Sequence, residues 1–574
     1  MSGPAKSSVE QAIRACRSAF IGVFLVSAVL NLLMLTGPLF MLQIYDRVLA
    51  SGSVPTLVVL SGIALSLYLF NGALDILRSR ALSRVSMQVY AALSGPALRA
   101  NIRIPMLAGA KAGGLHPGRD LDTLRRFLGS SGPAAIFDLP FMPFYFLLVF
   151  IFHPLLGAMA VAGGVLIFVL VVANELSARA PTREVGSRSA AQTKLMDSAR
   201  RNAEVVNAMG MLGRLSGRFG HLLGGYYTAQ MQSSDRSNLY SSIIKTLRLL
   251  LQSAMLGLGA YLAIHQEITP GVMIAASIIM ARALSPIEQA VSQWPSFVAA
   301  RQASGRLNQM LHQSAEKAGT EGLPLPSASL RIDQMATSAP GEQVVLLHGV
   351  NFTLAAGDGL GVIGPSGSGK TSLARALVGV WPVLKGAVRL DGSTLDQWNE
   401  ETRGHFVGYL PQDVELFDGT VAENISRFET TPDMAAIVAA AKLAGVHSLI
   451  TRLPEGYNCV VGESGARLSA GQRQRIALAR ALYGQPFLVV LDEPNSNLDA
   501  EGEQALTAAL TEIRKRGSIV IVVAHRTSAL AGVNKVLIIQ NGQQAAFGDR
   551  DEVLSKLAVI SQAPSGKDVL SHAI

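Results

Sequence analysis

Two stretches in the C-terminal half of the chain carry residues suited to phosphate chemistry. The first, GPSGSGKT at 364–371, has the spacing G-x-x-x-x-G-K-T between a predicted strand and a predicted helix. In that context the glycines let backbone N–H groups point at phosphate oxygens beside a helix N-terminus. Lys370 can reach the terminal phosphates, and the Thr371 hydroxyl can bind Mg²⁺. The predicted phosphate-binding loop comprises Gly364, Pro365, Ser366, Gly367, Ser368, Gly369, Lys370, Thr371 and Ser372.

The second stretch, LVVLDEP at 488–494, predicts a buried strand that ends in two acids. Its four consecutive apolar residues are typical of a parallel strand covered on both faces. Asp492 can hold Mg²⁺ through water, and Glu493 can orient or deprotonate an attacking water. Downstream of a phosphate-binding loop, this pair indicates hydrolysis of a nucleoside triphosphate.

Three weaker signals occur in the same half. Gln412 follows a predicted strand and can reach both the metal and the water, which makes Thr371, Gln412 and Asp492 the candidate metal ligands. His525 follows the apolar run SIVIVVA, within reach of a γ-phosphate, and Asp499 stands just after the two acids in SNLD. Each of these alone is more often ordinary structure. Together they predict a catalytic set of Glu493, His525 and Gln412.

The N-terminal half has the composition of a membrane domain. The chain has 574 residues, of which 49% are hydrophobic and only 16% charged, whereas soluble domains carry about 25% charged residues. Charge-free runs cover 18–45, 48–74 and 139–174, the last broken by FHP at 152–154. Weaker apolar segments occupy 243–265 and 271–294. Because one span needs about 20 residues, we predict six membrane-spanning helices.

The distribution of charge predicts the orientation of these helices. Residues 1–320 carry a formal charge of +14 and residues 321–574 one of −5. The basic residues gather between spans two and three and between spans four and five, which places both segments and the N-terminus in the cytoplasm. Both segments are long and helical in pattern, so we expect the membrane helices to continue into the cytoplasm. Nucleic-acid binding is disfavoured, because the positive charges lie between apolar runs.

Span six contains two ionisable residues, Arg282 and Glu288. Ionisable side chains at membrane depth face a bundle interior or a watery path far more often than lipid. One hypothesis is that this helix lines a translocation path. An equal alternative is that the span ends before Arg282. Asp138, flanked by Pro140 and Pro143, is expected to cap or orient its own span.

A Gly-, Pro- and Ser-rich stretch divides the two halves. EKAGTEGLPLPSASL, residues 316–330, is the expected linker. The predicted organisation is a cytoplasmic N-terminus at 1–18, a transmembrane domain at 19–315, the linker, a nucleotide-binding domain at 331–555 and a tail at 556–574. The predicted fold is therefore a membrane all-α domain of six transmembrane helices followed by an α/β P-loop NTPase domain.

The order of the C-terminal motifs resembles the nucleotide-binding domain of ABC transporters. GPSGSGKT, Gln412, LSAGQ at 468–472, LVVLDE, SNLD and His525 follow one another as in that family. Six spans before one such domain resemble an exporter half-transporter, which implies ATP as the nucleotide and a homodimer as the working unit. LSAGQ is similar to the ABC signature, which implies that Ser469, Ala470, Gly471 and Gln472 clamp ATP held by the opposite subunit. Ser469 can cap a helix starting near Gln472, whose N-terminal end favours phosphate.

Four further stretches are similar to type I secretion exporters, specifically those for RTX-type metalloproteases and lipases. They are QIYDRVLASGS at 43–53, FDLPFMPFY at 137–145, VGVWPVLKGAVRLDG at 378–392 and YLPQDVELFDGTVAENI at 409–425. This resemblance implies a bacterial inner-membrane protein that moves unfolded polypeptides carrying a C-terminal signal. It also implies two partners, a periplasmic membrane fusion (adaptor) protein and an outer-membrane channel.

The same ATPase motifs occur in other kinds of ABC protein, which are the alternative interpretations. An exporter of lipid or small molecules shares every one of those motifs and is the main alternative. The six spans disfavour a soluble ABC ATPase of DNA repair or translation. The presence of both Glu493 and His525 disfavours a channel that only binds ATP.

The chain departs from the ABC pattern at one position. Many ABC domains place an aromatic residue before the phosphate-binding loop to stack on adenine. Here the matching stretch is SAPGEQVVL, with Pro340 near that position, and the sequence from Leu330 to Asn351 contains no Tyr, Phe or Trp. We therefore expect loose selectivity for the base.

Overall fold

The chain forms two compact units, each with its own core. The computed structural model describes residues 8–112, 114–314, 322–462, 465, 467–524 and 527–562. The helical unit comprises 8–103 and 114–314, and the sheet unit comprises 104–112 and 322–562. The predicted linker at 316–330 begins outside the described residues, and its last two residues open the first strand.

The helical unit has the six apolar helical segments that the sequence predicts. Within the described residues, six are long and apolar enough to cross a membrane: Arg17–Ser51, Val54–Ala108, Ser131–Phe152, Pro154–Arg201, Leu212–Ile264 and Pro270–Gln313. The prediction of six spans is therefore confirmed. The chain is a multi-pass membrane protein.

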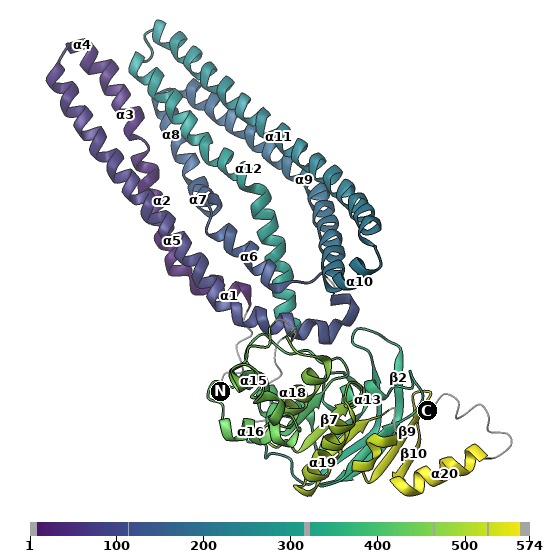
Figure 1. Cartoon of the computed structure of the whole chain (residues 1–574). Coiled ribbons are helices and arrows are strands. Elements are labelled where there is room, and N and C mark those ends of the chain that lie inside the picture. The colour runs from purple at the N-terminus through teal and green to yellow at the C-terminus, as the bar shows by residue number, and fades with distance from the viewer. Residues whose placement is uncertain are drawn as a thin grey trace. The chain divides into compact units, whose positions relative to one another are not determined.

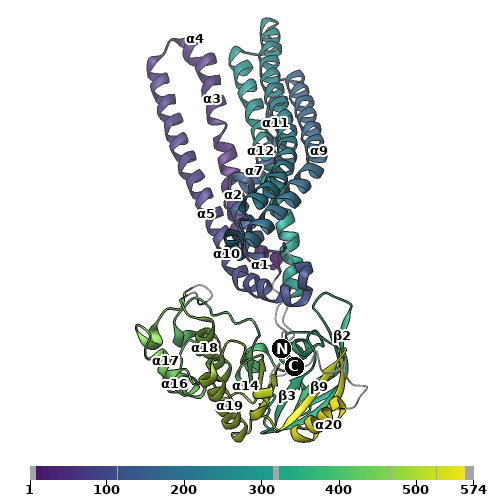
Figure 2. The same cartoon turned by 45° about the vertical axis from the view of Figure 1, so that its right-hand side comes forward.

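Four of these helices extend well beyond their apolar parts. Helix α5 has 55 residues, α9 has 48, α11 has 53 and α12 has 44, whereas about 20 suffice for a span. Figures 1 and 2 show α9 and α11 running side by side. The elements are α1 Val9–Ala15, α2 Arg17–Leu33, α3 Thr36–Gln43, η1 Ile44–Val48, α4 Leu49–Ser51, α5 Val54–Ala108, η2 Gly109–Ala112, α6 Pro117–Leu128, α7 Ser131–Asp138, η3 Leu139–Phe141, α8 Met142–Phe152, α9 Pro154–Arg201, α10 Ala203–Ala208, α11 Leu212–Ile264 and α12 Pro270–Gln313.

The predicted break at FHP separates α8 from α9. His153 has an extended backbone, and its Nδ1 accepts a hydrogen bond from the Leu155 N–H at 3.2 Å. Pro154 occupies the first position of α9, where its missing N–H costs nothing. One charge-free stretch is thus divided into two helices by a cap and a proline.

Asp138 orients three helices of the helical unit. It is the last residue of α7, and its carboxylate accepts hydrogen bonds from Arg78 of α5 at 3.0 Å and from Asn31 of α2 at 2.9 Å. The Tyr145 hydroxyl of α8 donates to the Asn31 carbonyl at 2.7 Å. Of the two roles expected for Asp138, the structure supports orientation, because the side chain makes no capping hydrogen bond to η3, which follows it.

The sheet unit contains two sheets. A four-stranded antiparallel sheet has the order β2-β1-β4-β5, and a six-stranded sheet has the order β10-β9-β3-β8-β7-β6. In the larger sheet β9, β3, β8, β7 and β6 are parallel, and Figure 2 shows β3 beside β9. The strands are β1 Ser329–Ser338, β2 Val345–Ala355, β3 Gly359–Ile363, β4 Val383–Leu390, β5 Ser393–Thr394, β6 Val407–Leu410, β7 Leu488–Asp492, β8 Ile519–Val523, β9 Lys535–Gln540 and β10 Gln543–Asp549.

Helices cover both faces of the larger sheet. Val489 and Leu491 of β7 pack into one hydrophobic cluster with α18, whereas Leu488 and Val490 pack into the other with α13. This confirms that LVVLD forms a buried parallel strand, because only a strand covered on both faces tolerates consecutive apolar residues. The helices are α13 Lys370–Leu377, η4 Leu395–Gln397, α14 Glu400–Phe406, α15 Val421–Ile425, α16 Met434–Leu443, α17 His447–Ile450, η5 Gly456–Asn458, α18 Ala470–Leu482, α19 Ala500–Lys515, η7 Thr527–Gly532 and α20 Arg550–Gln562 (Figure 1).

The strand register brings four loops to one edge of the larger sheet. Leu410 at the end of β6 pairs with Leu491, Asp492 at the end of β7 pairs with Val523, and Val523 at the end of β8 also pairs with Val362 of β3. In open α/β sheets, ligands bind beyond the carboxyl ends of the parallel strands. The loops that carry the predicted phosphate and metal ligands therefore emerge together.

Candidate nucleotide site

The phosphate-binding loop connects β3 to α13, as predicted. A Cβ on Gly364 would lie 2.1 Å from the Ile539 carbonyl oxygen, and one on Gly369 would lie 2.7 Å from a Leu347 methyl group. Gly369 precedes α13 with φ +103°, a conformation that side chains disfavour. Ser366 and Gly367 are exposed at the tip of the loop. The glycines are thus required by the close approach of the backbone.

Lys370 is buried beneath the loop. Its Nζ donates hydrogen bonds to the carbonyls of Gly364 and Pro365, at 2.7 and 2.9 Å. Burial lowers the pKa of the Lys370 ammonium, and the nearby carboxylates of Glu493 and Asp492 oppose that shift. The lysine therefore closes the loop into a cradle and keeps a cation under it.

The polar groups of this cradle are suited to bind a nucleoside triphosphate and its metal ion. Thr371 donates its hydroxyl to Asp492 Oδ1 at 3.4 Å, which brings together a hydroxyl and a carboxylate, the oxygen donors that Mg²⁺ prefers. Among the described residues, the buried Ser368 hydroxyl has no hydrogen-bond partner. A phosphate oxygen bound in this glycine-rich loop would give such an unpartnered hydroxyl its hydrogen bond. Ser372 is buried in the first turn of α13.

Glu493 follows the buried strand in a strained conformation. Its φ is +50°, which is rare for a residue with a side chain and recurs at functional sites. Its N–H donates to the Val523 carbonyl of β8 at 3.1 Å. This backbone geometry turns the chain out of the sheet directly after Asp492.

Two further predicted residues lie beyond strand ends. Gln412 comes two residues after β6 and is exposed at the edge where Asp492 ends β7. His525 lies outside the described residues, two positions after the end of β8. The structure thus brings Gln412 to the predicted edge, and the role of His525 stays a prediction.

LSAGQ forms the cap of α18. Ser469 accepts from the Gln472 N–H at 3.3 Å, while Gln472 Oε1 accepts from the Ser469 N–H at 2.9 Å. Ser469 is the N-cap of α18, as predicted, and the helix begins at Ala470, two residues before the expected start near Gln472. A Cβ on Gly471 would lie 2.8 Å from the Asn497 carbonyl oxygen. Ser469 and Ala470 are exposed.

Gln474 links this helix to the acidic strand end, a role that sequence reasoning missed. Its Nε2 donates to the carbonyls of Pro494 at 2.5 Å and Glu493 at 3.3 Å, and its Oε1 accepts from the Asn497 N–H at 3.1 Å. The side chain is only 3% exposed. The available signal was an amide two residues past LSAGQ, at the start of the apolar face of the same helix.

Gln474 is a positioning residue, and its removal should slow turnover more than it weakens binding. Gln474→Leu leaves buried carbonyls and an N–H without partners, at a cost of about 1–3 kcal/mol. We expect kcat for ATP to fall about tenfold while KM changes by less than about threefold. Steady-state phosphate release measures both constants. Gln504→Leu, the same change at an exposed site of α19, should leave both unchanged.

Asp499 caps α19 next to the same loop. Its carboxylate accepts from the Gly502 N–H at 2.9 Å and from Arg475 of α18. These hydrogen bonds, that to Gly502 foremost, and the charge of Arg475 hold the pKa of Asp499 below its usual value. Asp499 thus connects the segment after Glu493 to α18.

The two ionisable residues of span six have different surroundings. Glu288 accepts a hydrogen bond from Arg248 Nε of α11 at 2.7 Å, and both side chains are mostly buried. Arg282 is exposed. Glu288 thus joins α12 to α11, and the structure pairs it with Arg248 rather than with Arg282.

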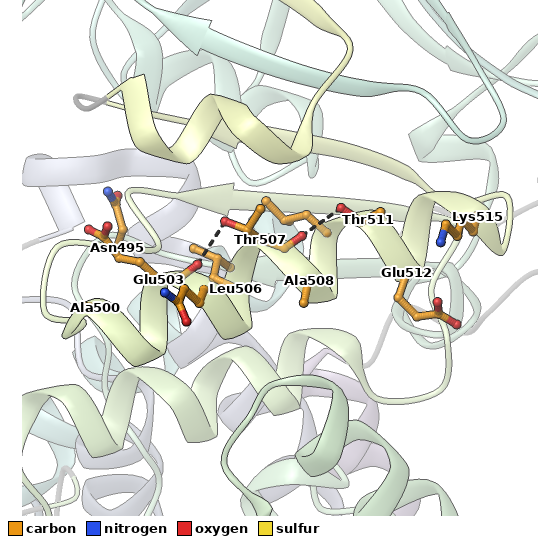
Figure 3. Close-up of a pocket in the computed structure, with 11 residues that line it drawn as sticks. Asn495, Ala500, Glu503, Leu506, Thr507, Ala508, Thr511, Glu512 and Lys515 are labelled. Atoms are coloured by element: carbon orange, nitrogen blue, oxygen red, sulfur yellow. Dashed lines mark hydrogen bonds between the residues drawn. The ribbon is translucent and has the colours of Figure 1, made fainter.

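The cavity drawn in Figure 3 lies along α19 and not at the phosphate-binding loop. It has a volume of about 720 Å³ and is lined by the exposed side of α19, including Glu503, Glu512 and Lys515. The hydroxyls of Thr507 and Thr511 donate to backbone carbonyls one turn earlier in the helix. The lining contains no phosphate-binding element, so we do not assign the nucleotide to it.

Comparison with known proteins finds matches to both halves of the chain. Residues 20–286 match the ABC transporter transmembrane region and residues 347–496 match the ABC transporter domain. The chain is 48% identical to the type I secretion system ATP-binding protein PrsD of Rhizobium meliloti (strain 1021), over 95% of this chain and 94% of PrsD. It is 27% identical to the cyclolysin secretion/processing ATP-binding protein CyaB of Bordetella pertussis, over 93% of this chain and 75% of CyaB.

A solved structure shows the same fold. A bacterial Atm1-family ABC exporter with ATP bound superposes with a TM-score of 0.83 and 22% identity, covering 96% of this chain and 99% of the other. Three observations agree on the family: the six apolar helical segments, the glycine cradle over a buried lysine, and the match to PrsD along nearly the whole chain. The chain is an ABC transporter ATPase that binds ATP, and it belongs to the family of type I secretion system ATP-binding proteins.

Proposed function

We propose that this protein uses ATP hydrolysis to export unfolded polypeptides across the bacterial inner membrane, as the energising component of a type I secretion system. The observation that carries the proposal is the 48% identity to PrsD along nearly the whole chain, together with a complete phosphate cradle. The expected cargo is a protease or lipase of the RTX type, or a similar protein with a C-terminal signal.

The proposed chemistry assigns one role to each group in the cradle. Lys370 and the loop N–H groups neutralise and position the phosphates, and Thr371, Gln412 and Asp492 hold Mg²⁺, which supplies charge neutralisation when bound. Glu493 takes the proton of the attacking water, and His525 contacts the γ-phosphate. Because phosphoryl transfer depends mainly on positioning and electrostatics, this set suffices without a covalent intermediate.

We propose a homodimer as the working unit. Ser469, Ala470 and Gly471 are exposed or half-buried at the start of a 13-residue helix whose N-terminal end favours phosphate. In this proposal they complete the site of the opposite copy. A periplasmic adaptor and an outer-membrane channel are the further partners, and the ATP-binding domain and N-terminus lie in the cytoplasm.

The proposed domains differ from the two compact units at residues 104–112, which group with the sheet unit but lie in the proposed transmembrane domain. Residues 19–315 form the transmembrane domain, preceded by the cytoplasmic segment 1–18, and residues 331–555 form the motor after the 316–330 linker. The tail, 556–574, begins within α20 and continues outside the described residues. Arg282 and Glu288 border the proposed translocation path.

Deleting the gene and comparing extracellular proteins by mass spectrometry tests the proposed cargo class. We expect one or more polypeptides to disappear from the medium and to return when the intact gene is restored. A gene carrying Lys370→Ala should not restore them. Unchanged secreted proteins with altered export of lipids or small molecules would contradict the proposal and support the alternative exporter.

Base selectivity gives a separate prediction. Residues 330–351, before the phosphate-binding loop, present the exposed aliphatic side chains of Val344, Val345 and Leu346 and contain no Tyr, Phe or Trp. Since aliphatic contact makes no hydrogen bond to the groups that distinguish adenine from guanine, we expect kcat/KM for GTP to lie within about tenfold of that for ATP. Phosphate release with each nucleotide measures the ratio. A much larger preference for ATP would refute loose selectivity.

A further inference from the structure

A basic cavity lies in the helical unit and shares no residue with the nucleotide site. It has a volume of about 750 Å³ and is walled by α9, by the start of α6 and by α12. Its lining includes five basic side chains and two carboxylates: Arg119, Arg183, Lys194, Arg201, Arg306, Asp120 and Asp197. The cavity therefore carries an excess of positive charge, and none of these residues belongs to the nucleotide site.

The basic side chains are mostly not neutralised within the chain. Arg306 pairs with the buried carboxylate of Asp120 at 2.5 Å. Among the side chains that the structure describes, Arg119, Arg183, Lys194 and Arg201 are exposed and form no ion pair. By contrast, Arg188 on the same helix is bonded to Glu184 at 2.7 Å. Four cations are thus available to an outside anion.

Three of these cations lie on one face of α9. Lys194 and Arg201 follow Arg183 by 11 and 18 residues, which correspond to about three and five whole turns of an α-helix. The helix is continuous from Pro154 to Arg201, and its internal Pro181 precedes all three positions. They therefore form a predominantly basic row about 27 Å long, with one acid, Asp197, between Lys194 and Arg201.

The position of this row along α9 excludes lipid headgroups for most of it. The charge-free part of α9 ends at Asn174, so that Lys194 and Arg201 lie about 30 and 40 Å further along the helix. Headgroups extend only about 5–8 Å beyond the hydrocarbon core on each side. A single phosphate group would also occupy only a small part of a row of that length.

An extended chain matches the row better. At about 3.4 Å per residue, roughly eight residues of extended polypeptide span 27 Å. We propose that this cavity binds an acidic, extended segment of polypeptide, with Arg183, Lys194 and Arg201 along one wall and Arg119 on the other. The inference rests on the proposed function, since it takes a stretch of the exported chain as the ligand.

A peptide-binding measurement tests this assignment on the full-length protein in lipid nanodiscs without nucleotide. The probe is a fluorescent glutamate peptide of about ten residues, long enough to follow the row, and the comparison peptide has glutamine throughout. We expect binding of the glutamate peptide only, weakening strongly between about 0.01 M and 1 M ionic strength as the Debye length falls from about 30 Å to 3 Å.

Charge reversal locates the binding site. The double variant Lys194→Glu/Arg201→Glu should bind the glutamate peptide at least about tenfold more weakly, because two attractions become repulsions. The control Arg214→Glu/Arg218→Glu makes the same charge change at exposed, unpaired positions of α11 that do not line the cavity. It should bind as the unmodified protein does. Both variants should retain basal ATP hydrolysis, which verifies folding.

Each of the other outcomes would overturn the inference. Equal losses in the two double variants would show only a general charge effect. If the Lys194→Glu/Arg201→Glu variant lost binding of inorganic phosphate or of anionic phospholipid vesicles but still bound the glutamate peptide, the cavity would be assigned to a different ligand. Loss of the dimer in the Lys194→Glu/Arg201→Glu variant alone would assign it to contact between copies. Because peptide binding is measured without secretion, its result stands apart from that of the gene deletion.

Discussion

Replacing Glu493 by glutamine should lower ATP turnover by about 10²- to 10⁴-fold, the usual contribution of a general base, while ATP binding persists. Glutamine keeps the size and hydrogen-bonding reach of the side chain but cannot accept a proton. The strained backbone at φ +50° and the Glu493 N–H bond to Val523 do not depend on the carboxylate. The variant should therefore hold ATP in a closed dimer that does not reopen.

Two measurements test this expectation together. Phosphate release gives the loss of turnover, and size-exclusion chromatography with ATP gives the fraction of stable dimer in the purified, reconstituted protein. Glu501→Gln is a matched control, since it makes the same chemical change at an exposed position of α19 eight residues away. Rapid hydrolysis by Glu493→Gln would refute the assignment of the base.

Lys370→Ala should abolish export and lower ATPase activity by about 10²- to 10³-fold or more, as expected for loss of a preorganised charge. Lys370 is buried, and its Nζ contacts two carbonyls of the loop. Removing it takes away the cation that faces the phosphates and opens the cradle at the same time. Lys370→Arg should not restore activity, because the planar guanidinium needs more room than the ammonium. Lys385→Ala, at an exposed site of β4, is the control.

Mixed dimers extend the same test to the partner subunit. A subunit with Lys370→Ala keeps an intact LSAGQ, and a subunit with Ser469→Arg keeps an intact phosphate cradle. If each site uses the cradle of one copy and the LSAGQ of the other, a mixture of the two inactive variants regains activity through one complete site per mixed dimer. A mixture as inactive as either parent would contradict the homodimer proposed above.

The sequence by itself determined the phosphate-binding loop, the acidic strand end and the six spans. These features depend on local rules. Glycine spacing dictates a loop that the backbone can close, a run such as LVVL needs burial on both faces, and a charge-free run of about 20 residues needs lipid or a core. Gly364 and Lys370 occupy the predicted loop, and Leu488 to Leu491 lie in the predicted strand. These local patterns can be recognised without knowing which distant residues are in contact.

Only the tertiary structure decided how distant residues meet. Gln474 holds the carbonyls of Glu493 and Pro494, and Glu288 pairs with Arg248, 40 residues away. The basic row on α9 lines a cavity because α6 and α12 form the opposite walls. These outcomes depend on packing between elements far apart in sequence, and local residue patterns do not encode which partner a buried amide or an ion will find.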